Sequence, residues 1–141
     1  MPAPMMISTK GRYALRVMID LARHDTGTYI PLSEIAERQG ISEKYLESIL
    51  GVLSKAGYLL ALRGKGGGYR LSRAPEDYKA GEILRLTEGT LAPVVCLEHG
   101  RRCEQAECCP TLPLWEGLDR VIGEYLDRYT LADLAGNRVA P

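Results

Sequence analysis

The sequence predicts a mainly α-helical protein that carries one small β-hairpin and a long helix near its end. Apolar residues recur at helical spacing through most of the chain, beginning after Ser8. The run Arg63-Gly64-Lys65-Gly66-Gly67-Gly68-Tyr69 interrupts this pattern with four glycines between two short apolar stretches, which is typical of a hairpin tip. Residues 112–129 then form a long amphipathic segment. These three observations predict the fold class.

Charge is distributed unevenly along the chain. The 141 residues include 18 Lys/Arg and 18 Asp/Glu, so the formal net charge is zero. Residues 1–73, however, hold 11 Lys/Arg and 6 Asp/Glu, a net of +5, while residues 74–141 hold 7 and 12, a net of −5. A basic first half indicates contact with nucleic acid, and the acidic second half is expected to do something else.

Composition also argues against several classes of protein. No stretch approaches the ~18 apolar residues of a membrane span, and residues 1–6 lack the basic and apolar regions of a signal peptide. We therefore expect a cytoplasmic protein with no membrane partner. His24 and His99 are the only histidines, and no nucleophile–base pair can be argued from them, so we expect no enzyme activity.

The first half is predicted to hold three helices. Ser8 and Thr9 are good N-caps for the first, which ends by Gly27. A second, short helix covers residues 34–39, and Gly40 breaks it in the position of a helix C-cap.

The third helix, over residues 42–55, begins at the capping residue Ser42 and completes a helix-turn-helix. The small Ala36 allows close helix crossing, Gly40 permits the tight turn, and spaced aliphatic residues lock the two helices together. The third helix is therefore the predicted recognition helix. Residues near its N-terminus reach base edges in such motifs, which indicates Lys44, Tyr45, Glu47 and Ser48. A solvated helix face is the alternative for Glu47.

The glycine-rich run is predicted to form a wing behind the helix-turn-helix. Arg63, Lys65, Arg70 and Arg73 surround its tip with positive charge, which suits a phosphate backbone or a minor groove. A nucleotide-binding phosphate loop would need a helix directly after the run, and Gly-Lys followed by Ser or Thr. A strand-like Tyr69-Arg70-Leu71 follows instead. We therefore predict a winged helix-turn-helix DNA-binding domain over residues 1–79.

All the cysteines lie between a short helix predicted over residues 80–88 and the long helix from residue 112. They are Cys96, Cys103, Cys108 and Cys109, and we assign residues 80–111 to the short helix and a sensor loop. Thiolates that converge from one loop suit a soft metal centre, either an iron–sulfur cluster or zinc. A metal-free redox switch is the third alternative. Ordinary loop thiols are the fourth.

The long helix predicted over residues 112–129 carries a continuous apolar stripe. Its members are Leu114, Trp115, Leu118, Val121, Ile122, Tyr125 and Leu126. A chain of this length has little else to cover such a face, so we expect a homodimer; packing against the first helix of the same chain is the alternative. Residues 112–135 are thus assigned to the dimerisation helix and C-terminal segment, and residues 136–141 to a tail.

Several segments resemble the Rrf family of bacterial winged-helix regulators, which includes iron–sulfur, nitric-oxide and cysteine-metabolism sensors. The similar segments are Ile7-Ser8-Thr9-Lys10-Gly11-Arg12-Tyr13-Ala14, Ile41-Ser42-Glu43-Lys44-Tyr45-Leu46-Glu47, Arg63 to Tyr69, Gly81-Glu82-Ile83, Leu114-Trp115 and Thr130-Leu131-Ala132-Asp133-Leu134. The resemblance implies a homodimeric transcriptional regulator, a repressor in preference to an activator, on an approximately palindromic double-stranded DNA operator.

The resemblance also implies how DNA is contacted. The recognition helix would enter the major groove and the wing the adjacent minor groove. The residues predicted to contact DNA are Thr9, Lys10, Arg12, Tyr13, Ser42, Lys44, Tyr45, Glu47, Ser48, Arg63, Lys65, Gly66, Gly67 and Tyr69.

Cluster-binding members of the family carry three cysteines before the long helix, with five residues between neighbours. Cys103 and Cys109 keep this gap, whereas six residues separate Cys96 from Cys103. The resemblance implies that Cys96, Cys103 and Cys109 are the metal ligands, with Cys108 as an alternative ligand. A 2Fe–2S cluster is expected in preference to a 4Fe–4S cluster.

The fourth ligand is left open. Leu112 stands where the iron–sulfur biogenesis regulator has a histidine, so the ligand would come from Cys108, an acidic side chain or the other subunit. The segment Gly89-Thr90-Leu91-Ala92-Pro93-Val94 also looks like the cysteine-metabolism branch, which lacks the three cysteines and is controlled by a protein partner. Control by zinc, by thiol redox or by a regulatory protein partner therefore remains the alternative to a cluster.

Overall fold

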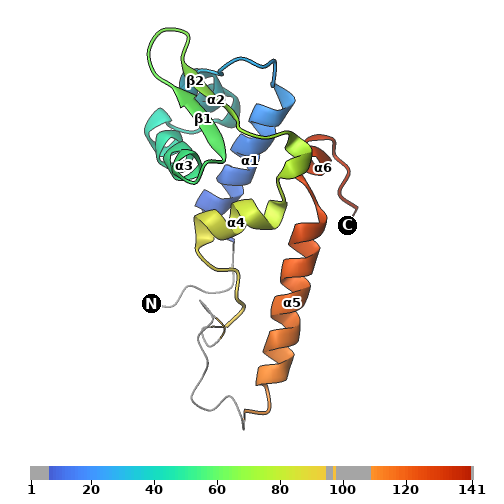
Figure 1. Ribbon diagram of the computed structural model, residues 1–141. Helices are drawn as coiled ribbons and strands as arrows, with labels where there is room; N and C mark the ends of the chain where they lie inside the picture. Colours follow the sequence, from blue (N-terminus) through green and yellow to red (C-terminus); the bar gives the residue numbers. More distant parts are fainter. Residues whose placement is uncertain (1–6, 95–96, 98–108, 141) are drawn as a thin grey trace.

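The computed structural model of the chain describes residues 7–94, 97 and 109–140. Within them the chain forms six α-helices, one 3-10 turn and one two-stranded antiparallel hairpin (Figure 1). In chain order these are α1 (Thr9–Arg23), α2 (Leu32–Gln39), α3 (Glu43–Lys55), β1 (Leu59–Leu62), β2 (Gly68–Leu71), η1 (Pro75–Asp77), α4 (Ala80–Glu88), α5 (Leu112–Arg128) and α6 (Leu131–Ala135). The predicted fold class, mainly α with a small hairpin, is confirmed.

Local capping sets the ends of the first three helices. Ser8 caps α1 by accepting a hydrogen bond from the Gly11 amide, and Ser42 caps α3 by accepting one from the Tyr45 amide at 3.1 Å. Gly40 ends α2 in the left-handed region, at φ 65° and ψ 35°, where a side chain is disfavoured. The helix α1 ends before Gly27, and α2 begins two residues earlier than expected, at Leu32.

The core lies where α1, α2 and α3 meet the hairpin and α4. Its fully buried side chains include Met18 on α1, Ile35 on α2 and Leu46 on α3, at the positions that helical periodicity brings to one face. Tyr78, which follows η1, is also fully buried among them. Hydrophobic burial of this face holds the helix-turn-helix on α1.

The hairpin packs beside α3, and the segment before α2 forms an isolated β-bridge with β2. Leu59 pairs with Leu71 and Leu62 with Gly68 across β1 and β2. On the outer side of β2, Ile30 and Tyr69 exchange two backbone hydrogen bonds of 2.9 Å. A Cβ on Gly68 would clash with the Ile30 carbonyl oxygen, so only glycine allows this segment to approach so closely.

The long helix α5 extends away from the winged-helix body, as Figure 1 shows. It packs chiefly against α4, and packing against α1, the alternative arrangement, is at most slight. None of its residues is buried. The backbone then returns to the body, where the Leu131 amide donates to the Tyr78 carbonyl and the Ala80 amide to the Tyr129 carbonyl, each at 2.9 Å. Across the described residues, no helix is both long and apolar enough to cross a membrane.

Candidate nucleic-acid interface and thiol site

The N-terminal part of α3 presents four polar side chains that the sequence predicts to contact bases. Lys44 and Glu47 are exposed, and within the described part of the chain neither makes a hydrogen bond or ion pair. Ser48 is exposed too, but its hydroxyl donates to the Tyr45 carbonyl at 2.7 Å and Ser42 is engaged as the cap. Lys44 and Glu47 therefore keep free polar groups on this helix end, as does the exposed Glu43 among the described residues.

The predicted contact residues of α1 lie next to those of α3. The rings of Tyr13 and Tyr45 meet edge to face, with centroids 6.0 Å apart. Arg16 covers the Tyr13 ring at 5.1 Å, and Arg12 is exposed and donates to the Thr9 hydroxyl at 3.1 Å. The two aromatic rings thus join the start of α1 to the start of α3.

The wing tip keeps its two terminal cations exposed. Arg63 and Lys65 lie at the exposed turn, and among described residues no carboxylate pairs with either. Gly66 is also exposed, whereas Tyr69 is half-buried and bonded to Ile30. This leaves the two cations available to a polyanion.

The expectation that Arg70 and Arg73 also surround the tip was wrong. Arg70 lies on β2, where its guanidinium covers the Tyr29 ring at 5.7 Å. Arg73 lies at the base of the hairpin and donates to Glu82 of α4 at 3.2 Å. Sequence proximity to the glycines suggested a tip role for both, but β2 carries them back to the body of the domain.

Among the predicted metal ligands, Cys109 lies within the described residues, and Cys96, Cys103 and Cys108 lie outside them. Cys109 is a free, partly exposed thiol two residues before the N-cap of α5, with its sulfur 3.3 Å from the Thr111 hydroxyl oxygen. Hydrogen bonds from the Thr111 hydroxyl and then from the Thr111 and Leu112 amides lower the pKa of the Cys109 thiol. No group of three or more His, Cys, Asp or Glu side chains that could hold a metal occurs within the described ranges.

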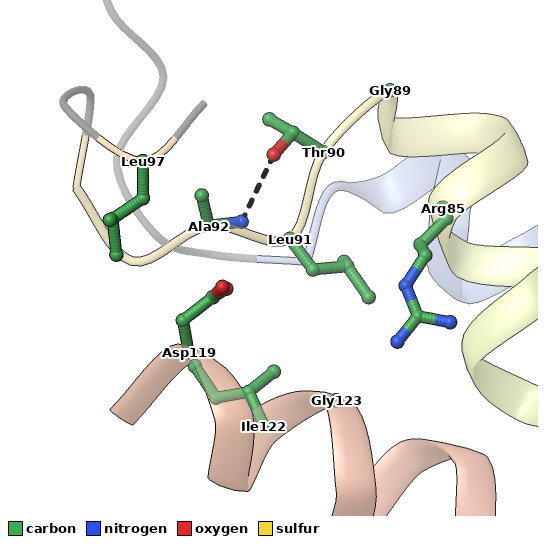
Figure 2. A pocket seen from close by; sticks show the side chains of 9 residues that line it. All are labelled: Arg85, Gly89, Thr90, Leu91, Ala92, Leu97, Asp119, Ile122 and Gly123. Carbon is green, nitrogen blue, oxygen red and sulfur yellow. Dashed lines mark hydrogen bonds between the residues drawn. The ribbon is translucent and has the colours of Figure 1, made fainter. Parts of the chain in front are cut away.

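A cavity of about 380 Å³ opens between α4, the segment after it and α5 (Figure 2). It is lined by Arg85, Gly89, Thr90, Leu91, Ala92, Leu97, Asp119, Ile122 and Gly123. The Thr90 hydroxyl accepts a hydrogen bond from the Ala92 amide at 3.1 Å, which shapes the turn that leaves α4. The predicted cysteine segment therefore begins at a loosely packed junction between two helices.

Two groups of polar residues near these sites were missed by sequence reasoning. Glu88, the last residue of α4, accepts hydrogen bonds from Ser8, 80 residues away. Glu82 meets Tyr58 and Arg73 at the wing base. Neither contact has a periodic or motif-like signal, because the partners come from different elements.

Comparison with known proteins agrees with this architecture. A model of the Rrf2 family, described as iron-dependent transcriptional regulators, matches residues 7–137. The HTH-type transcriptional regulator IscR of Vibrio atlanticus is 39% identical over 131 residues, which cover 92% of this chain and 75% of that protein.

Two solved structures are similar at the same level of identity. CymR (YrzC), the global cysteine regulator of B. subtilis, has a TM-score of 0.72 and 38% identity, covering 94% of this chain and 97% of that one. IscR of T. potens has a TM-score of 0.74 and 38% identity, covering 96% and 93%. The likeness runs from the first helix to the last, so the chain belongs to the Rrf2 family and is a DNA-binding transcriptional regulator.

Proposed function

We propose that this protein is a cytoplasmic, homodimeric repressor whose operator binding is controlled through its cysteine segment. The observation that carries the DNA-binding part is the pairing of free polar side chains on α3 with an exposed cationic wing. Lys44 and Glu47 supply hydrogen-bonding groups of opposite character to base edges in the major groove. Arg63 and Lys65 supply charge to the phosphates beside the adjacent minor groove. Tyr45 and Ser48 are the other two candidates for base edges, and the remaining predicted residues are assigned to DNA contact, with no catalytic role.

The exposed face of α5 supports the homodimer. Leu114 and Val121 are 63% and 57% exposed, and Leu118 and Tyr125 are exposed on the same side of the helix. Apolar side chains at this spacing form a stripe, and a stripe left open to water is stabilised by burial against a second copy. Two copies related by a twofold axis would present two recognition helices to an approximately palindromic operator.

We propose that Cys96, Cys103 and Cys109 hold an iron–sulfur cluster, with Cys108 as the alternative ligand. The chemistry of the donor set fits, because thiolates are the usual ligands of such clusters and the pKa of Cys109 is lowered. The description of the family as iron-dependent supports the same assignment. A 2Fe–2S cluster is preferred to a 4Fe–4S cluster, and when bound it would make the cysteine segment responsive to iron, oxidants or nitric oxide.

The test of the cluster is an absorption spectrum with iron and sulfide analysis on protein purified without oxygen. We expect visible charge-transfer bands with matching iron and sulfide, lost in Cys109→Ser and kept in Cys108→Ser. The neighbouring cysteine is the matched control, and loss in Cys108→Ser alone would exchange the roles of the two. A colourless wild-type protein, before and after reconstitution, would contradict the cluster.

The second candidate is control without a cluster, by thiol oxidation, zinc or a protein partner. The similarity to CymR, the global cysteine regulator of B. subtilis, supports this candidate, as does the lowered pKa of Cys109, which favours the reactive thiolate. Zinc analysis tests control by zinc, and the mass shift of each cysteine peptide after oxidation tests control by thiol oxidation. Absence of both would leave the protein partner. DNA binding is common to both candidates.

A selection from a randomised duplex library tests DNA binding itself. The full-length chain is expected to enrich an inverted repeat, since a symmetric dimer presents two equal recognition helices. If circular dichroism shows that the protein is folded and no sequence is enriched, the proposed operator binding is contradicted. Enrichment of a single half-site would contradict the dimeric arrangement alone.

A further inference from the structure

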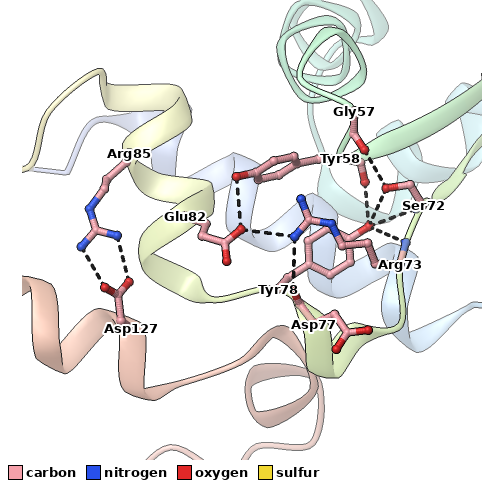
Figure 3. Close-up of polar contacts among 9 residues, drawn as sticks. All are labelled: Gly57, Tyr58, Ser72, Arg73, Asp77, Tyr78, Glu82, Arg85 and Asp127. Carbon is pink, nitrogen blue, oxygen red and sulfur yellow. Dashed lines mark hydrogen bonds and ion pairs between the residues drawn. The ribbon is translucent and has the colours of Figure 1, made fainter.

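The short helix α4 directs three charged side chains to three different parts of the molecule. Glu82, Arg85 and Glu88 follow one another at intervals of three residues, so each is next to the following one on the helix surface, and the series turns gradually around the helix. Figure 3 shows the first two, one turned to the wing base and the other to α5. Each of the three is met by a partner from another element.

Glu82 closes a network at the base of the wing. Its carboxylate accepts hydrogen bonds from the Tyr58 hydroxyl and from Arg73, both at 3.2 Å (Figure 3). The Arg73 guanidinium also lies over the rings of Tyr58 and Tyr78, 4.7 and 4.9 Å from their centroids. Tyr58 precedes β1 and Arg73 follows β2, so Glu82 joins both ends of the hairpin to α4.

Tyr78 braces the same two ends from the buried side. Its hydroxyl donates to the Tyr58 carbonyl at 2.7 Å and accepts from the Ser72 and Arg73 amides at 3.0 and 3.1 Å. These bonds hold the two ends of the hairpin to Tyr78, two residues before α4 begins. The wing base and α4 therefore form one bonded unit.

Arg85 fastens α4 to the last turns of α5. Its two terminal nitrogens donate to the two carboxylate oxygens of Asp127, at 2.9 and 3.2 Å. A paired contact of this kind fixes orientation as well as distance. Gly81 is part of the fit, because a Cβ there would lie 2.1 Å from an Asp127 oxygen.

Glu88 fastens the end of α4 to the start of α1. One carboxylate oxygen accepts from the Ser8 amide at 3.0 Å and from the Ser8 hydroxyl at 2.6 Å. Because the hydroxyl proton is directed at Glu88, a lone pair of Ser8 faces the Gly11 amide, which donates to it at 3.1 Å. A Cβ on Gly11 would lie 2.1 Å from the same Glu88 oxygen, so the approach depends on glycine.

We propose that α4 is the coupling element of the regulator. When α5 shifts, its contact with Arg85 moves α4, and the contacts of Glu82 and Glu88 then move the wing base and the first turn of α1. This inference rests on the proposed function, since it assigns the path by which the state of the cysteine segment reaches the DNA-contacting residues. The three side chains are positioning residues. The segment that holds the cysteines leaves α4 directly at Gly89, and α5 is the helix that follows it.

Hydrogen–deuterium exchange on the full-length protein tests the coupling without any ligand. In Arg85→Gln and in Asp127→Asn, we expect exchange to rise at least threefold over residues 58–73 and 8–12, while α2 is unchanged. Arg120→Gln is the matched control, because it removes an exposed ion pair with Glu124 on the same long helix. Unchanged exchange at the wing, or a uniform rise that includes α2, overturns the inference.

A second measurement asks whether the coupling carries the signal. The affinity for a duplex selected by the wild-type protein is measured in two states, cluster-loaded and apo, or thiol-oxidised and reduced if no cluster forms. We expect the ratio of the two duplex affinities to fall at least fivefold in Arg85→Gln and to stay at the wild-type value in Arg120→Gln. A ratio kept in Arg85→Gln overturns the coupling role. If the wild-type protein has equal affinity in both states, the proposed sensing is contradicted instead. The exchange experiment then still tests whether α4 couples α5 to the wing.

Discussion

Asp20 is a buried charge that fixes α1 to the helix-turn-helix. It is 4% exposed, and its carboxylate accepts from Arg38 at 2.7 and 2.9 Å and from Gln39 at 3.0 Å. Burial by itself would raise the pKa of Asp20, but the hydrogen bonds from Arg38 and Gln39 outweigh it and lower that pKa. The carboxylate is therefore stabilised in its charged form by the second helix.

Asp20→Asn should lower the free energy of unfolding by about 2 kcal/mol at pH 7, because the charge-assisted bonds are lost. A lowered native pKa means that this stabilisation is present above the pKa of the unfolded chain. It is lost as the pH falls from about 4 through the native pKa. Urea unfolding of the wild type and Asp20→Asn at pH 7 and below pH 4 measures both effects.

The difference in free energy of unfolding between wild type and Asp20→Asn should shrink at the lower pH. Glu37→Gln, an exposed position beside Arg38 on α2, is the control and should change stability by less than about 0.5 kcal/mol. A constant difference between the two proteins at all pH values would contradict the assigned role of Asp20.

The wing cations give a second prediction for single residues. Replacing Arg63 and Lys65 together by Ala should weaken binding to a selected duplex and reduce the slope of log K against log salt by about 2, because two phosphate contacts are lost. Binding titrations between low and high salt measure the slope. Lys55→Ala, at the exposed C-terminal end of α3, is the control. An unchanged slope in the double variant would exclude the wing from the interface.

The elements of the helix-turn-helix follow from local chemistry. Capping at Ser42 and the left-handed conformation at Gly40 fix where α2 ends and α3 begins. No atom lies within 4 Å of a Cβ placed on Gly40 or on Gly51, so space does not distinguish these two glycines. Only the backbone conformation does, since Gly40 has φ 65° and Gly51 lies inside α3.

Opposite effects of alanine are therefore expected at these two positions. Gly40→Ala should cost about 1 kcal/mol of stability, because alanine is strained in the left-handed region. Gly51→Ala should stabilise by roughly 0.5–1 kcal/mol, because it reduces the backbone entropy of the unfolded chain. Thermal and urea unfolding measure both variants. Equal effects would mean that the turn is not held as the structure has it.

The whole molecule is a winged-helix body with a projecting helix, and half of the large apolar side chains exposed in its described part lie on α5. Four of its apolar side chains are exposed, although the core of the body is closely packed. A face of this kind determines how two copies are spaced, and hence how two recognition helices are spaced. Dimerisation is therefore a prediction for the whole molecule.

Val121→Glu and Leu118→Glu should convert the dimer to a monomer and weaken operator binding at least tenfold, because charge is placed in the proposed apolar contact. Sedimentation equilibrium measures the first effect and duplex titration the second. Glu124→Gln, outside the apolar stripe of the same helix, is the control. Persistence of the dimer in both variants would place its interface elsewhere.

The sequence by itself determined the three helices, the turn at Gly40, the hairpin, and the extent of α4 and α5. Capping residues, helical periodicity and glycine runs act over a few neighbouring positions, so they can be recognised without the fold. The domain boundaries and the roles of the predicted DNA-contacting and metal-binding residues stay predictions from the sequence.

Only the tertiary structure decided which distant side chains meet. It moved Arg73 from the wing tip to the wing base, brought Glu88 to Ser8, and left the apolar face of α5 open where packing on α1 had been the alternative. Such contacts depend on how separate elements pack in three dimensions, and no spacing along the chain encodes the distance between Ser8 and Glu88. The physical reason is that capping is local, whereas the pairing of charges across elements is fixed only once the shared core has formed.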